Sequence, residues 1–398
     1  MNRRPYREGG SIVRCAAACL LAYLLRPATA GADFITNLVV RGSNRTFIVH
    51  VPTTYDGSRA FPVLLMFHGL NSSAAAAASS TYDWQTMACS NRFLVVFPES
   101  LSPPGKNIEI LGSVIYSNYD GIGKRWDVAH IQGTNRMDSQ DVDFAAAILD
   151  WMQATYNVRT SHVFTTGHSY GAFFSYYVAG GLQGRIKAFA EHSGGLMGYL
   201  SAIYWPLAVT SPPPSVPGLL LHSPADPTVA YSNSVLLRDQ MTLRGQTNSL
   251  VTLPDALGHA WDKAHNQTQW DFFLSQTPVM DDDADGIPDS WEWRNGLDDT
   301  QDDSGADPDH DGATNLEEYR AGTDPQDGDS VFEATPEAAG EYLVRWASVS
   351  GKTYSIFCAP NPASPFTSLV STVEATPPRN TYTAAPPADA SFYRLSIP

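Results

Sequence analysis

The chain has 398 residues, a formal net charge of −16 and a hydrophobic content of 43%. Its length exceeds what one ordinary core fills, so we expect two or three domains of a globular protein. Most of the acidity is local, because residues 281–329 contain 18 acidic and two basic side chains, and this excludes nucleic acid as a partner and favours cations.

The N-terminus has the organisation of an export signal. Four arginines, at positions 3, 4, 7 and 14, precede an apolar stretch, residues 15–25, and Ala28-Thr29-Ala30 forms a small-residue cleavage site before Gly31. The stretch is too short to span a bilayer as a helix, which needs about 20 residues. We therefore expect residues 1–30 to be a signal peptide, the mature protein to be secreted and no membrane span to remain. An uncleaved anchor is the alternative.

Residues 31–278 alternate strand-like and helix-like segments. Continuous apolar runs indicate strands buried on both faces at 61–68 and 93–97. The pattern predicts further strands at 162–166, 187–191, 218–221 and 250–253, and helical runs at 140–156 and 172–178. Together they predict an α/β fold with a doubly wound, mostly parallel sheet and an active site at the carboxyl ends of its strands. The segment 103–133 is either a lid or a plain surface excursion.

A G-x-S-x-G pentapeptide, Gly167-His168-Ser169-Tyr170-Gly171, lies between a predicted strand and a predicted helix. A strand that turns sharply into a helix pushes the serine hydroxyl out of the backbone, and the glycines avoid collisions in so tight a turn. This context predicts the nucleophile elbow of an α/β-hydrolase, with Ser169 as the nucleophile. A structural glycine turn is the alternative.

Two later residues supply the partners that a serine nucleophile needs. Asp226 follows a predicted strand end, and His259 lies in a loop before the last predicted helix of this region. The order Ser169, Asp226, His259 is that of α/β-hydrolases. The histidine would take the serine proton, and the aspartate would fix its tautomer. Asp255 is the nearest rival for the acid, but it shares a loop with His259.

The turn His68-Gly69-Leu70-Asn71 ends an early predicted strand, where α/β-hydrolases place half of the oxyanion hole. The backbone N–H groups of Leu70 and Tyr170 are the predicted oxyanion donors. His68 is interpreted as a turn residue and His168 as a neighbour of the nucleophile. Two other histidines, His192 and His222, are interpreted as strand-end residues with local hydrogen bonds.

Two acidic segments share one pattern of oxygen-bearing residues, and the second begins 26 residues after the first. Oxygen-bearing side chains occupy positions 1, 3, 5, 9 and 12 of each loop, and glycine occupies position 6. Calcium needs six to eight oxygens and a chain that bends around the ion. The predicted calcium ligands are Asp281, Asp283, Asp285, Asp289 and Glu292 in the first loop, and Asp307, Asp309, Asp311, Asn315 and Glu318 in the second. The predicted role of calcium is structural, and no cofactor is predicted for catalysis; a disordered acidic linker is the alternative.

After residue 330 the composition changes again. Apolar and polar residues alternate at 342–346 and 352–357, and a third such run at 392–397 closes the chain. These segments predict a small all-β module near the lower size limit for an independent core. The expected division is a signal peptide at 1–30, a catalytic domain at 31–278, calcium-binding repeats at 279–329 and a β module at 330–398.

Residues 45–276 resemble the secreted esterase family that contains polyhydroxybutyrate depolymerases and feruloyl esterases. The shared motifs are the strand into His68-Gly69, the run 93–98, the segment 141–144, the elbow, and the segments around Asp226 and His259. The resemblance implies a secreted serine carboxylesterase that hydrolyses feruloyl-type plant-wall esters or polyhydroxyalkanoate-type polyesters, including insoluble polymers. Leu70, Tyr170 and Ser223 depart from the residues common in this family. The acidic loops resemble the thrombospondin type 3 repeats of exported bacterial proteins.

Two other functions remain open at this point. A surface-binding or adhesion protein could carry an inactive hydrolase domain, and a serine peptidase could share the fold. The complete ordered set of serine, acid and histidine argues against the inactive domain. The peptidase is disfavoured because the sequence shows no peptide-binding propeller domain.

Overall fold

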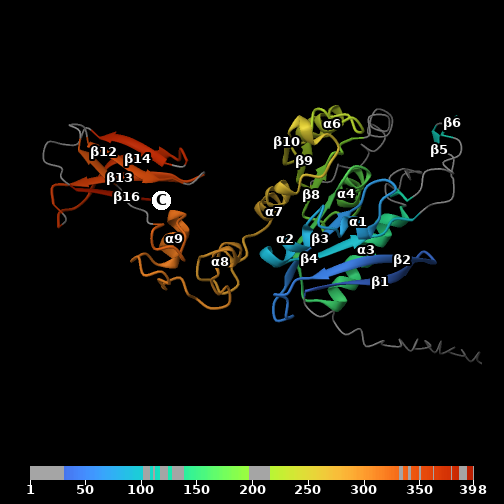
Figure 1. Ribbon diagram of the computed structural model, residues 1–398, viewed down its shortest axis with the longest axis horizontal. Coiled ribbons are helices and arrows are strands. Elements are labelled where there is room, and N and C mark those ends of the chain that lie inside the picture. The colour runs from blue at the N-terminus through green and yellow to red at the C-terminus, as the bar shows by residue number, and fades with distance from the viewer. Residues whose placement is uncertain are drawn as a thin grey trace, which may run out of the picture.

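The computed structural model describes residues 31–101, 108–110, 113–116, 124–127, 139–196, 216–330, 335–338, 342–348, 351–361, 363–377, 379–384 and 392–397. The predicted signal peptide and most of the segment 103–133 lie outside these ranges. The described chain forms a larger α/β body and a smaller β body, with helices α8 (Asp289–Asn295) and α9 (Asn315–Ala321) between them (Figure 1).

An eight-stranded sheet forms the centre of the α/β body, in the order β1-β2-β4-β3-β7-β8-β9-β10. Its strands are β1 (Ala32–Val40), β2 (Ser43–Val51), β3 (Phe61–Phe67), β4 (Leu94–Pro98), β7 (Val158–Gly167), β8 (Ala188–His192), β9 (Gly218–His222) and β10 (Asn248–Thr252). Strands β4, β3 and β7 to β10 are parallel, whereas β1 and β2 pair antiparallel. The predicted α/β fold with a mostly parallel sheet is therefore confirmed.

The antiparallel hairpin of β1 and β2 was not predicted from the sequence. The two strands are joined by Arg41 and Gly42, which both have positive φ, at 48° and 77°. Two positive φ angles in a two-residue loop are typical of the turn that matches the twist of a hairpin. Because arginine is uncommon in this conformation, the turn gives only a weak signal in the sequence.

Helices cover both faces of the sheet. They are α1 (Ala74–Ala77), α2 (Trp84–Asn91), α3 (Gln140–Thr155), α4 (Tyr170–Gly181), α6 (Ser232–Leu243) and α7 (Asn266–Ser275). Helix α3 matches the predicted helix, and it begins where it does because the Ser139 hydroxyl accepts from the N–H groups of Asp141 and Val142. Among the described residues, every helix is too short or too polar to cross a lipid bilayer.

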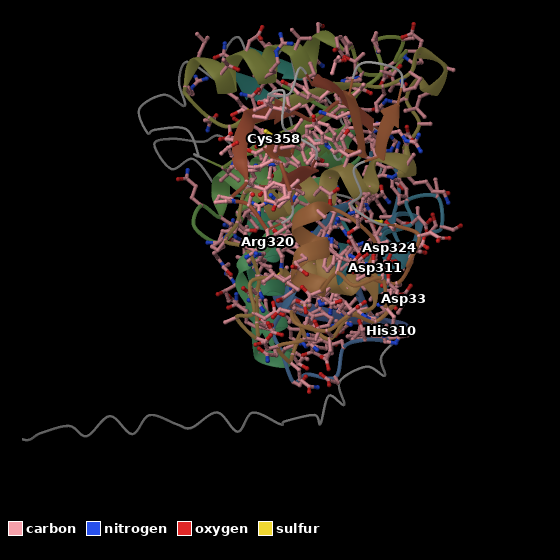
Figure 2. All side chains as sticks on the ribbon, turned by 90° about the vertical axis from the view of Figure 1, so that its left-hand side faces the viewer. Asp33, His310, Asp311, Arg320, Asp324 and Cys358 are labelled. Carbon is pink, nitrogen blue, oxygen red and sulfur yellow. The ribbon has the colours of Figure 1, made fainter. Side chains whose placement is uncertain are left out.

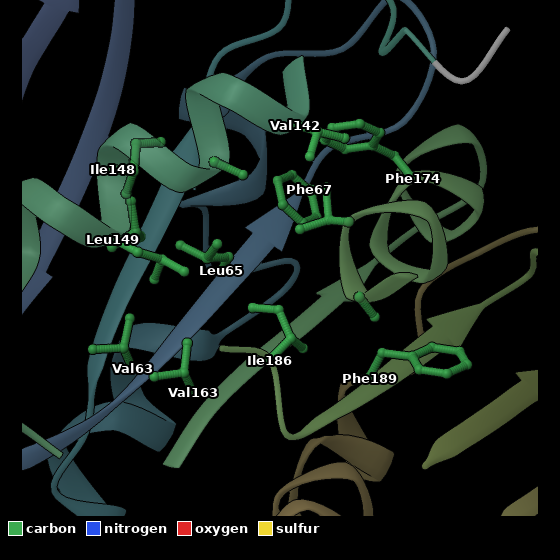
Figure 3. Close-up of a cluster of buried hydrophobic side chains, with 14 of the residues drawn as sticks. Val63, Leu65, Phe67, Val142, Ile148, Leu149, Val163, Phe174, Ile186 and Phe189 are labelled. Atoms are coloured by element: carbon green, nitrogen blue, oxygen red, sulfur yellow. The ribbon is translucent and has the colours of Figure 1, made fainter. Parts of the chain in front are cut away.

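Strand β3 shows how the two faces form separate cores. All of its residues are buried. Val63, Leu65 and Phe67 pack in one cluster with side chains of α3, α4 and α6 (Figure 3), whereas Leu64 and Met66 pack in the other with side chains of α1, α2 and α7. Successive side chains of a strand point to opposite faces, so a strand buried on both sides must be apolar throughout.

The first acidic repeat contacts the α/β body. Asp299 is buried and forms ion pairs with Arg59 and Arg92, the latter at 2.7 Å. On β7, the Arg159 Nη2 donates to both carboxylate oxygens of Asp282 at 2.6 and 2.8 Å. These contacts hold the start of the acidic segment near the N-terminal end of β7, which is the end opposite the elbow.

The C-terminal body consists of two three-stranded sheets. One has the order β11-β12-β15 and the other β14-β13-β16. The strands are β11 (Thr335–Ala338), β12 (Tyr342–Ala347), β13 (Thr353–Ala359), β14 (Thr367–Glu374), β15 (Arg379–Ala384) and β16 (Phe392–Ser396). The three predicted strands correspond to β12, β13 and β16, and the other three were missed. Trp346, Tyr354 and Ile356 form its buried core.

A short two-stranded sheet, β5 (Ile108–Ile110) and β6 (Ser113–Tyr116), completes the described strands. Cys89 and Cys358 are free thiols; Cys358 is buried, and Cys89 is partly exposed.

Candidate functional site

Ser169 occupies a strained turn between β7 and α4. Its φ and ψ angles are 57° and −119°, a conformation that costs a non-glycine residue free energy. A methyl group on Gly171 would lie 2.1 Å from the Phe67 carbonyl oxygen, and one on Gly167 would lie 2.2 Å from the Gly171 carbonyl oxygen. The two glycines are therefore required by steric exclusion, and the turn has the geometry predicted for a nucleophile elbow.

Ser169, His259 and Asp226 form one hydrogen-bonded chain. The Ser169 Oγ lies 2.9 Å from the His259 Nε2, and the His259 Nδ1 lies 2.6 Å from the Asp226 Oδ2. A carboxylate can only accept, so Nδ1 carries the proton and donates it to Asp226, which leaves Nε2 to accept from the serine hydroxyl. This is the arrangement in which the imidazole can remove the serine proton.

Asp226 is held as a carboxylate by four donors. Its Oδ1 accepts from the N–H groups of Thr228 and Val229 at 2.8 and 2.9 Å, and its Oδ2 accepts from His259. Burial acts to raise the pKa of Asp226, but the bonds from His259, Val229 and Thr228 outweigh it, and the net pKa lies below the usual value. The geometry thus favours Asp226 over Asp255, the rival acid from the sequence.

The fourth donor to Asp226 is His222, whose part in the site was missed. The His222 Nε2 lies 3.2 Å from the Asp226 Oδ2 and 3.0 Å from the Val229 carbonyl oxygen, and its Nδ1 lies 2.7 Å from the Ser234 Oγ. Both atoms that Nε2 faces are acceptors, so Nε2 carries a proton and donates it, and burial lowers the pKa of His222. The strand-end position was predicted, but the reach to Asp226 was not.

His168 also does more than flank the nucleophile, which corrects the interpretation from the sequence. Its Nε2 donates to the His259 carbonyl oxygen at 2.9 Å, and its Nδ1 accepts from the Tyr82 hydroxyl at 3.0 Å. The ring also contacts those of His192 and Trp261. His168 thereby connects the elbow to the backbone of the loop that presents His259. Burial, and then repulsion from His259, lower the pKa of His168 to about 4.

This lowered pKa predicts that the folded protein loses stability at acidic pH, and that replacing His168 removes part of the loss. The unfolded histidine takes up a proton near pH 6.5 and the folded one near pH 4, so the unfolded state binds more protons between these values. The contribution of neutral His168 to the free energy of unfolding is fully present above pH 6.5. It is lost as the pH falls from 6.5 to 4, by on the order of 3 kcal/mol in total. Calorimetric unfolding of wild type and His168→Gln between pH 7 and 4 should show a shallower pH dependence in the variant; equal slopes would contradict the assignment.

The turn after β3 lies against the elbow, as an oxyanion hole requires. A methyl group on Gly69 would lie 3.5 Å from the Ser169 Cβ and 4.0 Å from its Oγ. His68 is fully buried, and its Nδ1 lies 2.8 Å from the Gly69 carbonyl oxygen. That bond fixes the peptide group whose other end is the N–H of Leu70. His68 is thus a turn residue, as predicted, and Tyr170 is the first residue of α4.

The predicted calcium ligands of the first loop gather in space. One oxygen each from Asp281, Asp283 and Asp285 lie within 4.8 Å of one another, and Asp285 also forms such a group with Glu292 and Asp303. Asp303 lies outside both predicted loops and was missed, because no spacing rule connects it to them. Burial, and then the charges of nearby aspartates, raise the pKa of Glu292 to about 8.

The second loop repeats this arrangement. One oxygen each from Asp307, Asp309 and Asp311 lie within 4.8 Å of one another. Glu318 and Asn315 are fully buried in α9. Burial, and then the three aspartates, raise the pKa of Glu318 to about 7. Figure 2 shows Asp311 and its neighbour His310 on the side of the molecule that carries the C-terminal body.

Several buried oxygens of both loops accept no hydrogen bond from a described residue. They belong to Asp283, Asp285, Asp289, Glu292, Asp307, Asp309, Asn315 and Glu318. Hard oxygen ligands of this kind, gathered around a glycine bend, suit calcium.

A mostly parallel sheet has helices on both faces, and a serine, a histidine and an aspartate are hydrogen-bonded to one another at the carboxyl ends of its strands. This is the arrangement of the α/β-hydrolase fold. Residues 40–271 match the Esterase family, whose model is described as "Putative esterase". The chain belongs to this family.

Similar proteins include a curated enzyme and several solved structures. The bifunctional acetylxylan esterase/xylanase XynS20E of Neocallimastix patriciarum is 30% identical over 155 residues, which cover 39% of this chain and 18% of that enzyme. A ferulic acid esterase from Anaeromyces mucronatus is 16% identical with a TM-score of 0.43, over 62% of this chain and 89% of that one. An acetyl xylan esterase from Aspergillus awamori is 14% identical with a TM-score of 0.44, over 60% and 99%. The chain thus spans less than a fifth of the curated relative's length.

Proposed function

We propose that the protein is a secreted serine esterase that cleaves acyl groups from plant-wall polysaccharides, with acetyl and feruloyl esters as its substrate class. The observation that carries the proposal is the hydrogen-bonded chain from Ser169 through His259 to Asp226. The partial identity to an acetylxylan esterase supports the choice of substrate. Polyhydroxyalkanoate-type polyesters are the second candidate, from the resemblance to depolymerases.

The acylation step follows from the proton positions in this chain. The Ser169 Oγ attacks the ester carbonyl carbon while the His259 Nε2 takes its proton, and Asp226 stabilises the imidazolium. The N–H groups of Leu70 and Tyr170 would hold the tetrahedral oxyanion, where one such donor contributes about 3 kcal/mol. The carbon–oxygen bond to the alcohol then breaks, and His259 gives its proton to the leaving oxygen.

Deacylation reverses the proton path. Water attacks the acyl-enzyme carbonyl carbon, and His259 takes a proton from it. The bond to Ser169 breaks, the proton returns to the serine oxygen, and the free acid leaves. The products are one acid and one alcohol, and the enzyme is restored.

A product assay on acetylated xylan, methyl ferulate and polyhydroxybutyrate film tests the substrate class. Acetate or ferulate release, with little hydroxybutyrate, is the expected result. Hydroxybutyrate as the main product would overturn the plant-wall assignment in favour of the depolymerase. Release of no acid from any of the three would favour the adhesion protein.

We further propose that the two acidic loops bind calcium. The clustered carboxylates, with buried oxygens that accept no hydrogen bond, support this, since a divalent cation would supply the positive charge that offsets theirs. The first ion would be held by Asp281, Asp283, Asp285, Asp289 and Glu292, and the second by Asp307, Asp309, Asp311, Asn315 and Glu318. The ion's contribution would be to stiffen the segment between the two bodies.

Removal of calcium should therefore destabilise residues 279–330 and leave the ester chemistry intact. With a dissociation constant near 0.1 mM, as in extracellular modules, 1 mM calcium stabilises by about 1.4 kcal/mol per site. A chelator should lower the melting temperature and expose this segment to protease, and added calcium should restore both. If neither property responds, calcium binding is refuted.

The proposed domain division places residues 31–278 in the catalytic domain and 330–398 in a module that would hold the enzyme near an insoluble substrate. Export with cleavage after Ala30 is part of the same proposal, supported by the N-terminal pattern. Mass spectrometry of the protein recovered from culture medium should find Gly31 as its first residue, and a retained N-terminus would contradict it.

A further inference from the structure

Glu292 is the residue of the first acidic loop that most requires a cation. Its side chain is fully buried, and neither carboxylate oxygen accepts a hydrogen bond from a described residue. Burying a carboxylate without a partner costs several kcal/mol or more. An ion beside Glu292 would remove this cost, so the role of this side chain rests on the calcium binding proposed for the two loops.

Asp303 lies between the two loops, yet its carboxylate reaches the first. One oxygen each of Asp303, Asp285 and Glu292 lie within 4.8 Å of one another. Oxygens that share a calcium ion at 2.3–2.6 Å are at most about 5 Å apart, so the three can bind one ion. Asp303 accepts one hydrogen bond at each oxygen, from the Asp298 N–H at 3.3 Å and the Asn315 Nδ2 at 3.0 Å. Each oxygen therefore keeps a lone pair for the ion.

Asn315, at position 9 of the second loop, is fixed by the same Asp303. Its Nδ2 donates to the Asp303 carboxylate at 3.0 Å and to the Asp303 carbonyl oxygen at 2.9 Å. Both amide hydrogens are thus used. The Asn315 side chain is fully buried, and its Oδ1 accepts no hydrogen bond from a described residue. That oxygen is left to the second loop, which contains Asp307, Asp309 and Asp311.

We propose that Asp303 is a ligand of the first ion and, through Asn315, a positioning residue for the second, so that the two ions bind cooperatively. The first ion fixes the Asp303 carboxylate and, with it, the Asn315 amide. The second ion then binds an Asn315 side chain that is already ordered, so its binding does not include the entropy cost of ordering that side chain. Because coupling between sites is reciprocal, the second ion strengthens the first by the same factor.

Metal titration of the full-length chain tests the proposal without any measurement of ester hydrolysis. The protein is stripped with a chelator and titrated with calcium by calorimetry, and with terbium by tryptophan-sensitised luminescence. Trp291 and Trp293 adjoin Glu292 in α8 and would excite an ion bound there. Wild type should bind two ions along a sigmoidal curve. Asp303→Asn should weaken the first site by at least about tenfold, because one anionic ligand is lost, and should make the remaining curve hyperbolic.

Asp302→Asn is the matched control, because it removes the same charge one residue away. Asp302 is exposed, and its carboxylate accepts from the backbone and hydroxyl of Ser304. This variant should keep affinity within about twofold of wild type and keep the sigmoidal shape. Equal affinities for the two variants, or independent sites in wild type, would overturn the role of Asp303. If wild type takes up no calcium at millimolar concentration, the proposed calcium binding itself fails.

Discussion

Replacement of Ser169 by alanine is expected to lower kcat on p-nitrophenyl acetate by at least about 10⁴-fold, because the Ser169 Oγ is the atom that would form the acyl-enzyme. The backbone of the elbow should be retained, since alanine needs no more room than serine. Steady-state kinetics measure the loss, and circular dichroism shows that the variant is folded. A general serine-hydrolase reagent gives a second readout that is independent of substrate. A fluorophosphonate should phosphonylate the wild-type Ser169 Oγ with loss of fluoride, and intact mass should show one adduct.

Ser232→Ala is the control for this experiment, because Ser232 is an exposed serine at the start of α6. It should leave both the rate and the adduct unchanged. A Ser169→Ala protein that retains wild-type activity would show that another residue is the nucleophile. If wild type itself is inactive and takes up no reagent, the adhesion protein with an inactive hydrolase domain becomes the better explanation.

Replacement of Asp226 by asparagine is expected to lower kcat by about 10⁴-fold by trapping the wrong tautomer of His259. The N–H groups of Thr228 and Val229 point at Oδ1 and require an acceptor there. They would hold the amide oxygen of the asparagine and direct its NH₂ toward His259. The imidazole Nδ1 would then accept, Nε2 would carry the proton, and the serine hydroxyl would lose its base.

The matched control is Asp255→Asn, which alters the rival acid in the 3₁₀ turn before His259. It should leave kcat within about twofold of wild type, since Asp226 is the carboxylate that contacts His259. Both variants are compared by kcat and by melting temperature. A large loss in Asp255→Asn with little loss in Asp226→Asn would reverse the assignment of the acid.

The secondary structure near the site could be predicted where the signal is local. The apolar run of β3 is buried on both faces and can only be a central strand, and the pentapeptide around Ser169 follows from steric exclusion between Gly167, Gly171 and the end of β3. The hairpin of β1 and β2 was missed because its turn uses Arg41 in a conformation that its residue type does not favour. Three strands of the C-terminal body were missed because their alternation is weak.

The residues of the candidate site also divide into those with a local sequence signal and those without one. Ser169, Asp226 and His259 could be proposed from their order, and the acidic loops from their spacing, because both patterns lie along the chain. His168 and Asp303 could not, because each acts on residues that folding brings close: His168 bonds the carbonyl of His259, and Asp303 reaches both loops. His222 lies only four residues before Asp226, but the geometry of the turn between them decides that its ring reaches the carboxylate.

The sequence by itself therefore determined which residues can do the chemistry: an elbow serine, an acid, a histidine and two sets of oxygen ligands. Backbone sterics and fixed spacings are properties of short segments, so they can be recognised without the fold. Only the tertiary structure decided which acid faces His259, which buried histidines position that acid and His259, and which carboxylate connects the two acidic loops. Those choices depend on contacts between segments far apart in the chain, and packing of the whole domain sets such contacts.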